Sequence, residues 1–83
     1  MKFNAHINVM PQKALLDPQG RAVSAGMKNL NLSEIGNVRI GKHITLEVDA
    51  ASKEDAFQKV EMACKKLLAN PIMETYEFHL DPA

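Results

Sequence analysis

The sequence lacks the cysteine pairs and metal-ligand pairs that often stabilise small folds. Each absence excludes a class of small protein. Cys64 is the only cysteine among the 83 residues, so a disulfide within one chain is impossible. One cysteine and three scattered histidines also lack the paired spacing of a structural zinc site. A chain of this length buries only about 60–65 % of the surface that its unfolded form exposes. We therefore expect the chain to oligomerise or to dock on a larger protein.

The chain also lacks an excess of charge of either sign and any long apolar run. Ten basic and ten acidic residues cancel, which argues against nucleic acid or an anionic membrane as the main partner. No apolar run approaches the length of a transmembrane helix, and the first residues lack the apolar stretch of a signal peptide. We expect a single domain over residues 1–83 in the reduced environment of the cytoplasm.

Alternation of polar and apolar residues predicts the strands. It runs over residues 2–9 and 72–80, and over two shorter stretches, 38–40 and 44–48, on either side of Gly41-Lys42. We interpret the two shorter stretches as a β-hairpin whose loop contains a bulge or an odd number of residues. We expect the first strand to stop before Pro11, because proline has no N–H to give to a ladder.

The first helix is predicted after the first strand. Asp17 suits the N-cap, Pro18 suits the first helical position, and the helical spacing of apolar residues runs out near residues 29–31. Gly26 lies on the apolar stripe of this helix, where it lowers helix propensity by up to about 1 kcal/mol relative to alanine. We expect this helix to approach a sheet closely at Gly26, which would compensate.

The second helix is predicted between the last two strands. Ser52 and Asp55 resemble a capping box at its start, and Pro71 disfavours helix at the residue before it. The apolar stripe of this helix consists of Phe57, Val60, Cys64, Leu67 and Leu68.

The element order β-α-β-β-α-β predicts an α+β fold of the ferredoxin-like, or split βαβ, type. Both helices should cover one face of a four-stranded antiparallel sheet. With the strands numbered along the chain, right-handed crossovers give the order 4-1-3-2.

Polar side chains should gather on the sheet face away from the helices. His6 would approach Glu47 on one side and Glu77 or His79 on the other. We weigh a surface for a partner or a wet passage against an ordinary solvated sheet face, and we favour the solvated face. No metal is assigned there, since strand spacing alone does not fix ligand geometry.

No catalytic residue and no cofactor is predicted. Cys64 lies on an apolar stripe and is interpreted as a small buried hydrophobic residue. Residues 10–13, after the first strand, lack the glycine and arginine of a phosphate-cradling loop. Aromatic residues make up 5 % of the chain and lie on the apolar faces, so a base-stacking surface for RNA is excluded.

Three segments carry a resemblance to a known family. They are Leu16-Asp17-Pro18-Gln19-Gly20 with Ala22-Val23, then Val38-Arg39-Ile40-Gly41-Lys42 with Ile44, then Leu67-Leu68-Ala69-Asn70-Pro71-Ile72 with Glu74 and Tyr76. In this order and spacing the chain resembles the PurS family, the small subunits of phosphoribosylformylglycinamidine synthase. His79 lies in a stretch that is often acidic in that family, and residues 10–14 match it poorly.

The resemblance implies a non-catalytic subunit of a complex that converts formylglycinamide ribonucleotide, glutamine and ATP to the amidine. In that family a glutaminase subunit, PurQ, releases ammonia, and a synthetase subunit, PurL, uses the ammonia with ATP. PurS dimers join the two and assist ammonia transfer. A homodimer or a dimer of dimers is therefore expected. The alternative is a free-standing ferredoxin-like regulatory module that binds a small metabolite.

Three residues within the resembling segments are candidates for partner contacts. A helix start and a hairpin explain Asp17, Pro18 and Gly41, but they do not require the side chains of their neighbours. We hypothesise that these neighbours contact a partner subunit or the adjacent protomer; they are Gln19, Arg39 and Lys42.

Overall fold

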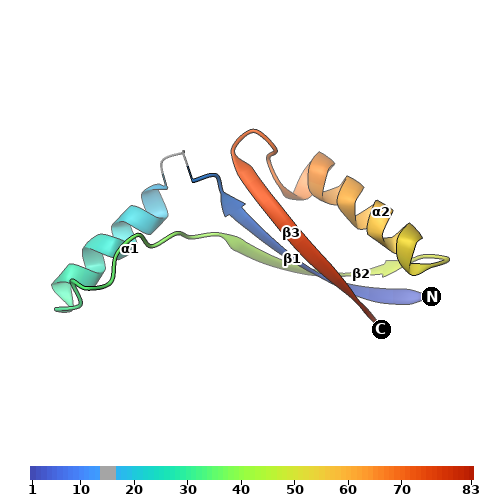
Figure 1. Cartoon of the computed structure of the whole chain (residues 1–83), viewed down its shortest axis with the longest axis horizontal. Helices are drawn as coiled ribbons and strands as arrows, with labels where there is room; N and C mark the ends of the chain where they lie inside the picture. The colour runs from blue at the N-terminus through green and yellow to red at the C-terminus, as the bar shows by residue number, and fades with distance from the viewer. Residues whose placement is uncertain (14–16) are drawn as a thin grey trace.

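A computed structural model describes residues 1–13 and 17–83 of the chain. Three strands form one sheet, one helix covers it, and a second helix projects from its end (Figure 1). The elements are β1 (Lys2–Pro11), α1 (Pro18–Asn29), β2 (Lys42–Asp49), α2 (Lys53–Ala63), a π-helical extension η1 (Cys64–Leu68) and β3 (Glu74–Pro82). No helix of the described ranges is both long and apolar enough to cross a membrane.

The sheet is antiparallel, and β1 lies in its centre in the order β2-β1-β3. The three strands have the neighbours that the sequence predicts for them. β1 is longer than predicted, because Pro11 ends the strand opposite Glu74 without interrupting it. A proline is tolerated at the last residue of a strand, since only one N–H is missing there.

The predicted second strand, over residues 38–40, is wrong, so the sheet has three strands and not the expected four. Residues 38–41 form no strand, and β2 begins at Lys42. The backbone of this stretch is bound by side chains at α1: the Val38 N–H donates to Ser24 Oγ at 3.3 Å, and the Ile40 N–H donates to Asp17 Oδ2 at 3.0 Å. These donors are therefore not free to build a hairpin ladder.

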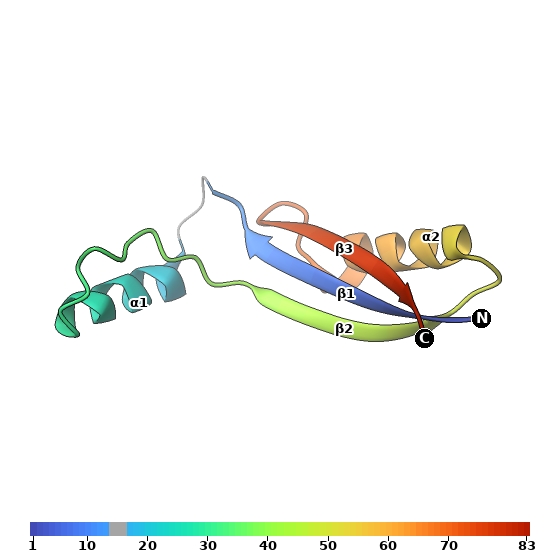
Figure 2. The same ribbon diagram turned by 60° about the horizontal axis from the view of Figure 1, so that its bottom comes forward.

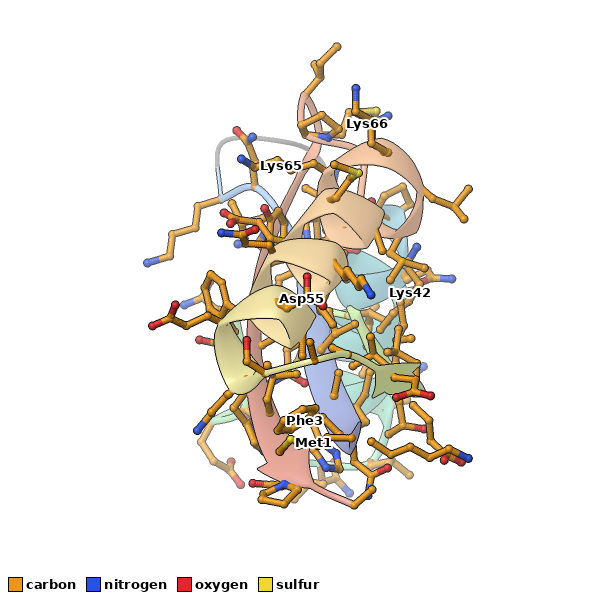
Figure 3. All side chains as sticks on the ribbon, turned by 90° about the vertical axis from the view of Figure 1, so that its right-hand side faces the viewer. Met1, Phe3, Lys42, Asp55, Lys65 and Lys66 are labelled. Carbon is orange, nitrogen blue, oxygen red and sulfur yellow. The ribbon has the colours of Figure 1, made fainter. Side chains whose placement is uncertain are left out.

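The core lies between α2 and one face of the sheet. β1 contributes Phe3, Ala5, Ile7 and Val9, and α2 with η1 contributes Ala56, Val60 and Cys64. Figure 3, seen from the end that carries both termini, shows α2 lying over the strands. The alternation in β1 therefore gives the inward face that the sequence predicts.

The start of α2 follows the sequence, whereas its end does not. Ser52 Oγ accepts from the Asp55 N–H at 3.1 Å, as expected for an N-cap. Leu67, expected on the buried stripe, is 82 % exposed. In η1 the Ala69 N–H donates to the Cys64 carbonyl five residues back, so the wider turn moves Leu67 off the stripe.

α1 does not cover the sheet, which corrects the expectation that both helices do so. It lies at one end of the molecule, and α2 lies at the other (Figure 2). A Cβ added at Gly26 would meet no described atom within 4 Å outside its own helix, so no sheet approaches there. The radius of gyration is 16.4 Å, against about 12 Å for a compact chain of this length. The protomer is therefore elongated.

Candidate functional site

Asp17, the N-cap of α1, fixes this helix to the chain that enters β2. Its Oδ1 accepts from the Gly20 N–H at 3.1 Å, and its Oδ2 accepts from the Ile40 N–H at 3.0 Å. The bond from Ile40, then the bond from Gly20 and the nearby Arg39 charge, hold the pKa of the Asp17 carboxyl below its ordinary value. Asp17 is therefore a carboxylate at neutral pH, and its charge contributes to the position of α1.

Arg39 ties the same region to the end of β1. Its Nη2 donates to the carbonyls of Pro11 at 2.6 Å and Gln12 at 3.0 Å, and its Nε lies 3.7 Å from Asp17 Oδ2. The side chain is 28 % exposed. We call the set Pro11, Gln12, Asp17, Gly20, Arg39 and Ile40 the α1 joint. Arg39 thus lies in an irregular segment and not in a strand, and its carboxylate partner belongs to its own chain.

Gln19 and Lys42 lie on the surface of the α1 joint. Both are exposed, and both line one cleft of about 350 Å³. Lys42 Nζ is 3.8 Å from Glu74 Oε2, and Lys42 opens β2 rather than occupying a turn. The structure therefore places the three candidate residues in one region, with Gln19 and Lys42 outside and Arg39 within. Leu16, from the same resembling segment, lies outside the described residues.

A second cleft, of about 750 Å³, runs along α1 and is mostly basic. Its charged lining consists of Lys13, Arg21, Lys28 and Arg39, with Asp17 as the acidic member. Composition gave no signal for this cleft, because the charges of the whole chain cancel. The fold gathers these cations by placing α1 beside residues 37–39.

All three histidines lie across the open face of the sheet. The His6 ring in β1 stacks on His79 of β3, with centroids 4.8 Å apart, and lies 6.1 Å from the His43 ring of β2. The register brings His6 opposite His79, whereas Glu47 and Glu77 lie opposite Asn4 and Asn8. Of the two alternatives predicted beside His6 in the last strand, His79 and Glu77, the structure has His79 directly opposite, whereas on the other side Thr45 and not Glu47 is opposite His6.

Asp81 joins this cluster, and sequence reasoning missed it. Its Oδ2 is 3.4 Å from His6 Nε2 and 3.7 Å from His79 Nε2. The signal was present, because Asp81 continues the alternation of Glu77 and His79. The predicted strand stopped at Leu80, one residue too early.

Cys64 is buried in the core, as predicted. Burial raises the pKa of its thiol, so the reactive thiolate is disfavoured. Its position between α2 and the sheet gives it a packing role.

A protein-family model settles the family. The PurS model, described as phosphoribosylformylglycinamidine (FGAM) synthase, matches residues 4–82. The chain belongs to the PurS family. PurS of Synechocystis sp. is 36 % identical over 78 residues, which cover 94 % of this chain and 78 % of the relative. PurS of Thermotoga maritima is 36 % identical over 75 residues, which cover 90 % of this chain and 92 % of the relative.

A solved PurS structure has the same elongated arrangement. A chain in the structure of PurLQS from Thermotoga maritima matches with a TM-score of 0.88 and 33 % identity, covering 98 % of this chain and 99 % of its own. α1 and the segment that leads to β2 form a large part of the chain, so this agreement requires α1 to lie in a similar place. The projecting helix is therefore a property shared with a solved PurS relative.

Proposed function

We propose that this chain is a cytoplasmic, non-catalytic small subunit of the FGAM synthase of purine biosynthesis. In this role the single PurS-like domain of residues 1–83 joins a PurQ glutaminase to a PurL synthetase and assists ammonia transfer. The observation that carries the proposal is the match, over nearly the whole chain, to a chain of PurLQS from Thermotoga maritima. The comparisons do not favour a free-standing module that binds a metabolite.

The shape of the protomer supports a role in assembly. α1 and the loop after it expose apolar side chains that no other described helix or strand covers, among them Val23 at 37 % in α1, and Leu30 at 67 % and Ile35 at 41 % after it. A second exposed apolar group lies at η1 and just after it, with Leu67 and Ile72 each at least 80 % exposed. Exposed apolar side chains gathered in one region mark interaction sites. Two such surfaces suit a subunit that forms a homodimer or a dimer of dimers and also meets larger partners.

The α1 joint supports a more specific proposal about contacts. Gln19 and Lys42 share a cleft and are exposed, so their side chains are accessible to a partner subunit or to a neighbouring protomer. Arg39 has three partners within its own chain, so we assign it the task of holding that surface in place as well as contacting the partner.

Reconstitution from purified subunits tests the proposal. FGAM formation is measured with PurL and PurQ, with and without this chain, once with glutamine and once with ammonium as nitrogen donor. We expect glutamine-dependent synthesis to require the chain, whereas ammonium-dependent synthesis by PurL does not. The isolated chain should hydrolyse neither glutamine nor ATP. Equal glutamine-dependent rates without the chain, or hydrolysis that survives further purification, would contradict the proposal.

A further inference from the structure

The open face of the sheet brings together one ligand atom from each of His6, His79 and Asp81. Asp81 Oδ2 lies 3.4 Å from His6 Nε2 and 3.7 Å from His79 Nε2. The three ligand atoms all lie within 4.8 Å of one another. Neither the core nor the α1 joint uses this cluster.

These separations suit a small transition-metal ion. Ligand atoms about 2.0–2.1 Å from a tetrahedral zinc ion are about 3.3 Å apart, and both distances to Asp81 are close to that value. The two imidazole planes are 18° from parallel, so the rings must turn to direct both nitrogens at one ion. His79 is 68 % exposed and His6 is 32 % exposed, and the terminal torsion of histidine is broad, so this rotation is accessible.

The backbone beneath the cluster is fixed by a long strand ladder. β1 and β3 pair from Phe3 opposite Pro82 to Pro11 opposite Glu74, with His6 directly opposite His79. Asp81 follows two residues after His79 on the same strand, which places it on the same face. Ligands carried on paired strands are held more rigidly than ligands on loops.

We propose that His6, His79 and Asp81 bind one divalent transition-metal ion of the zinc type, with water completing its coordination. Two imidazoles with one carboxylate suit zinc, cobalt or nickel, whereas magnesium and calcium prefer all-oxygen sites. His43 lies on the other side of His6, where its Nδ1 is 2.7 Å from Asn8 Oδ1, and it is not a member of the set. The proposed site stands independently of the assembly function.

Calorimetric titration of the full chain, prepared without a histidine tag, tests the site. The probes are Zn²⁺ and, as a hard-ion comparison, Mg²⁺, and Co²⁺ absorption reports the coordination geometry. The variants are His6→Ala, His79→Ala and Asp81→Asn, and His43→Ala is the matched control for loss of a surface histidine. Far-UV circular dichroism verifies the fold of each variant. Asp81→Asn keeps the side-chain shape and lies at an exposed position, so it tests the site even if His6→Ala fails to fold.

We expect one Zn²⁺ per chain, no comparable Mg²⁺ binding, and at least about a tenfold loss of Zn²⁺ affinity in each folded ligand variant. His43→Ala should keep the affinity of the parent within about twofold. The site is refuted if the parent shows no saturable Zn²⁺ binding in the micromolar range or binds Mg²⁺ equally well. It is also refuted if His43→Ala loses as much affinity as His79→Ala, or if Asp81→Asn binds like the parent, because either result indicates only adventitious binding by surface histidines.

Discussion

Asp17 serves two backbone donors that are far apart in the sequence. The Asp-Pro pair predicts an N-cap, and the bond from the Gly20 N–H confirms it. The second bond, from the Ile40 N–H, joins residues 23 positions apart, and no local pattern indicates it. The residue that begins α1 therefore also fixes the chain that returns from it.

The lowered pKa of Asp17 gives the α1 joint a predictable response to acid. A carboxyl whose folded pKa lies below its unfolded value of about 3.8 stabilises the fold fully above that unfolded value. This stabilisation is lost as the pH falls through the folded pKa. We expect the difference in thermal midpoint between the parent and Asp17→Asn to be constant above about pH 5 and to shrink in stronger acid. The other carboxyls are present in both proteins, so their contribution to the thermal midpoint cancels in the difference. Glu34→Gln, in the exposed loop after α1, is the control. A difference that stays constant into strong acid would show that the Asp17 charge does not hold the joint.

Arg39 and Lys42 should behave differently when each is replaced by alanine. Arg39→Ala removes two hydrogen bonds from a charged donor, so we expect it to lower the stability of the α1 joint by about 1–3 kcal/mol. Lys42→Ala and Gln19→Ala remove exposed side chains and should stay within about 0.5 kcal/mol. Native-state amide exchange along α1 measures the effect. Equal exchange rates in the Arg39 and Lys42 variants would show that the intrachain bonds of Arg39 contribute little.

At the scale of the element, α1 contains two glycines in opposite environments. A Cβ at Gly20 would collide with the Val38 carbonyl oxygen and lie 2.6 Å from Asp17 Oδ2, whereas a Cβ at Gly26 meets no described neighbour. We expect Gly20→Ala to destabilise the α1 joint by about 1–3 kcal/mol through overpacking. Gly26→Ala should instead stabilise α1 by up to about 1 kcal/mol through helix propensity.

Amide exchange and circular dichroism of the two variants side by side measure these effects, since the same substitution on the same helix provides the control. A neutral Gly20→Ala would mean that Val38 moves away without cost. A destabilising Gly26→Ala in the assembled protein would instead indicate that another chain packs against Gly26.

The strands show which parts of the structure the sequence could predict and which it could not. Alternation predicted β1, β2 and β3, because one face of each strand is covered and the other faces solvent. Residues 38–40 alternate as well, yet their donors bind Ser24 and Asp17, and such long-range competition leaves no local pattern. On the open face, the alternation of side chains along the strands correctly placed His6 near His79. Asp81 was missed because the predicted strand ended at Leu80, and only the side-chain distances show that these three side chains converge.

In the whole molecule, the described residues leave apolar surface on the protomer that they do not themselves cover. Its extents are 52 × 26 × 14 Å, and the helix that would complete a ferredoxin-like layer lies beyond the end of the sheet (Figures 1 and 2). An amphipathic helix of this length gains most of its stability from packing and not from propensity. The chain should therefore assemble with copies of itself.

Self-association should depend on the apolar residues at the end of α1. We expect light scattering at micromolar concentration to show a dimer or tetramer of the 9.2 kDa chain, and Leu30→Lys to shift it toward the monomer. Burying a lysine ammonium in an apolar contact is costly, whereas Leu30 is already exposed in the protomer, so the protomer itself should keep its fold. Asn29→Lys adds the same charge one residue earlier, at an exposed polar position, and should leave the assembly intact. Both lysines lie near the carboxyl end of α1, where a positive charge favours the helix, so loss of helix cannot explain a difference between them. A parent that scatters as a monomer, or a Leu30→Lys variant as large as the parent, would mean that α1 does not form the contact between protomers.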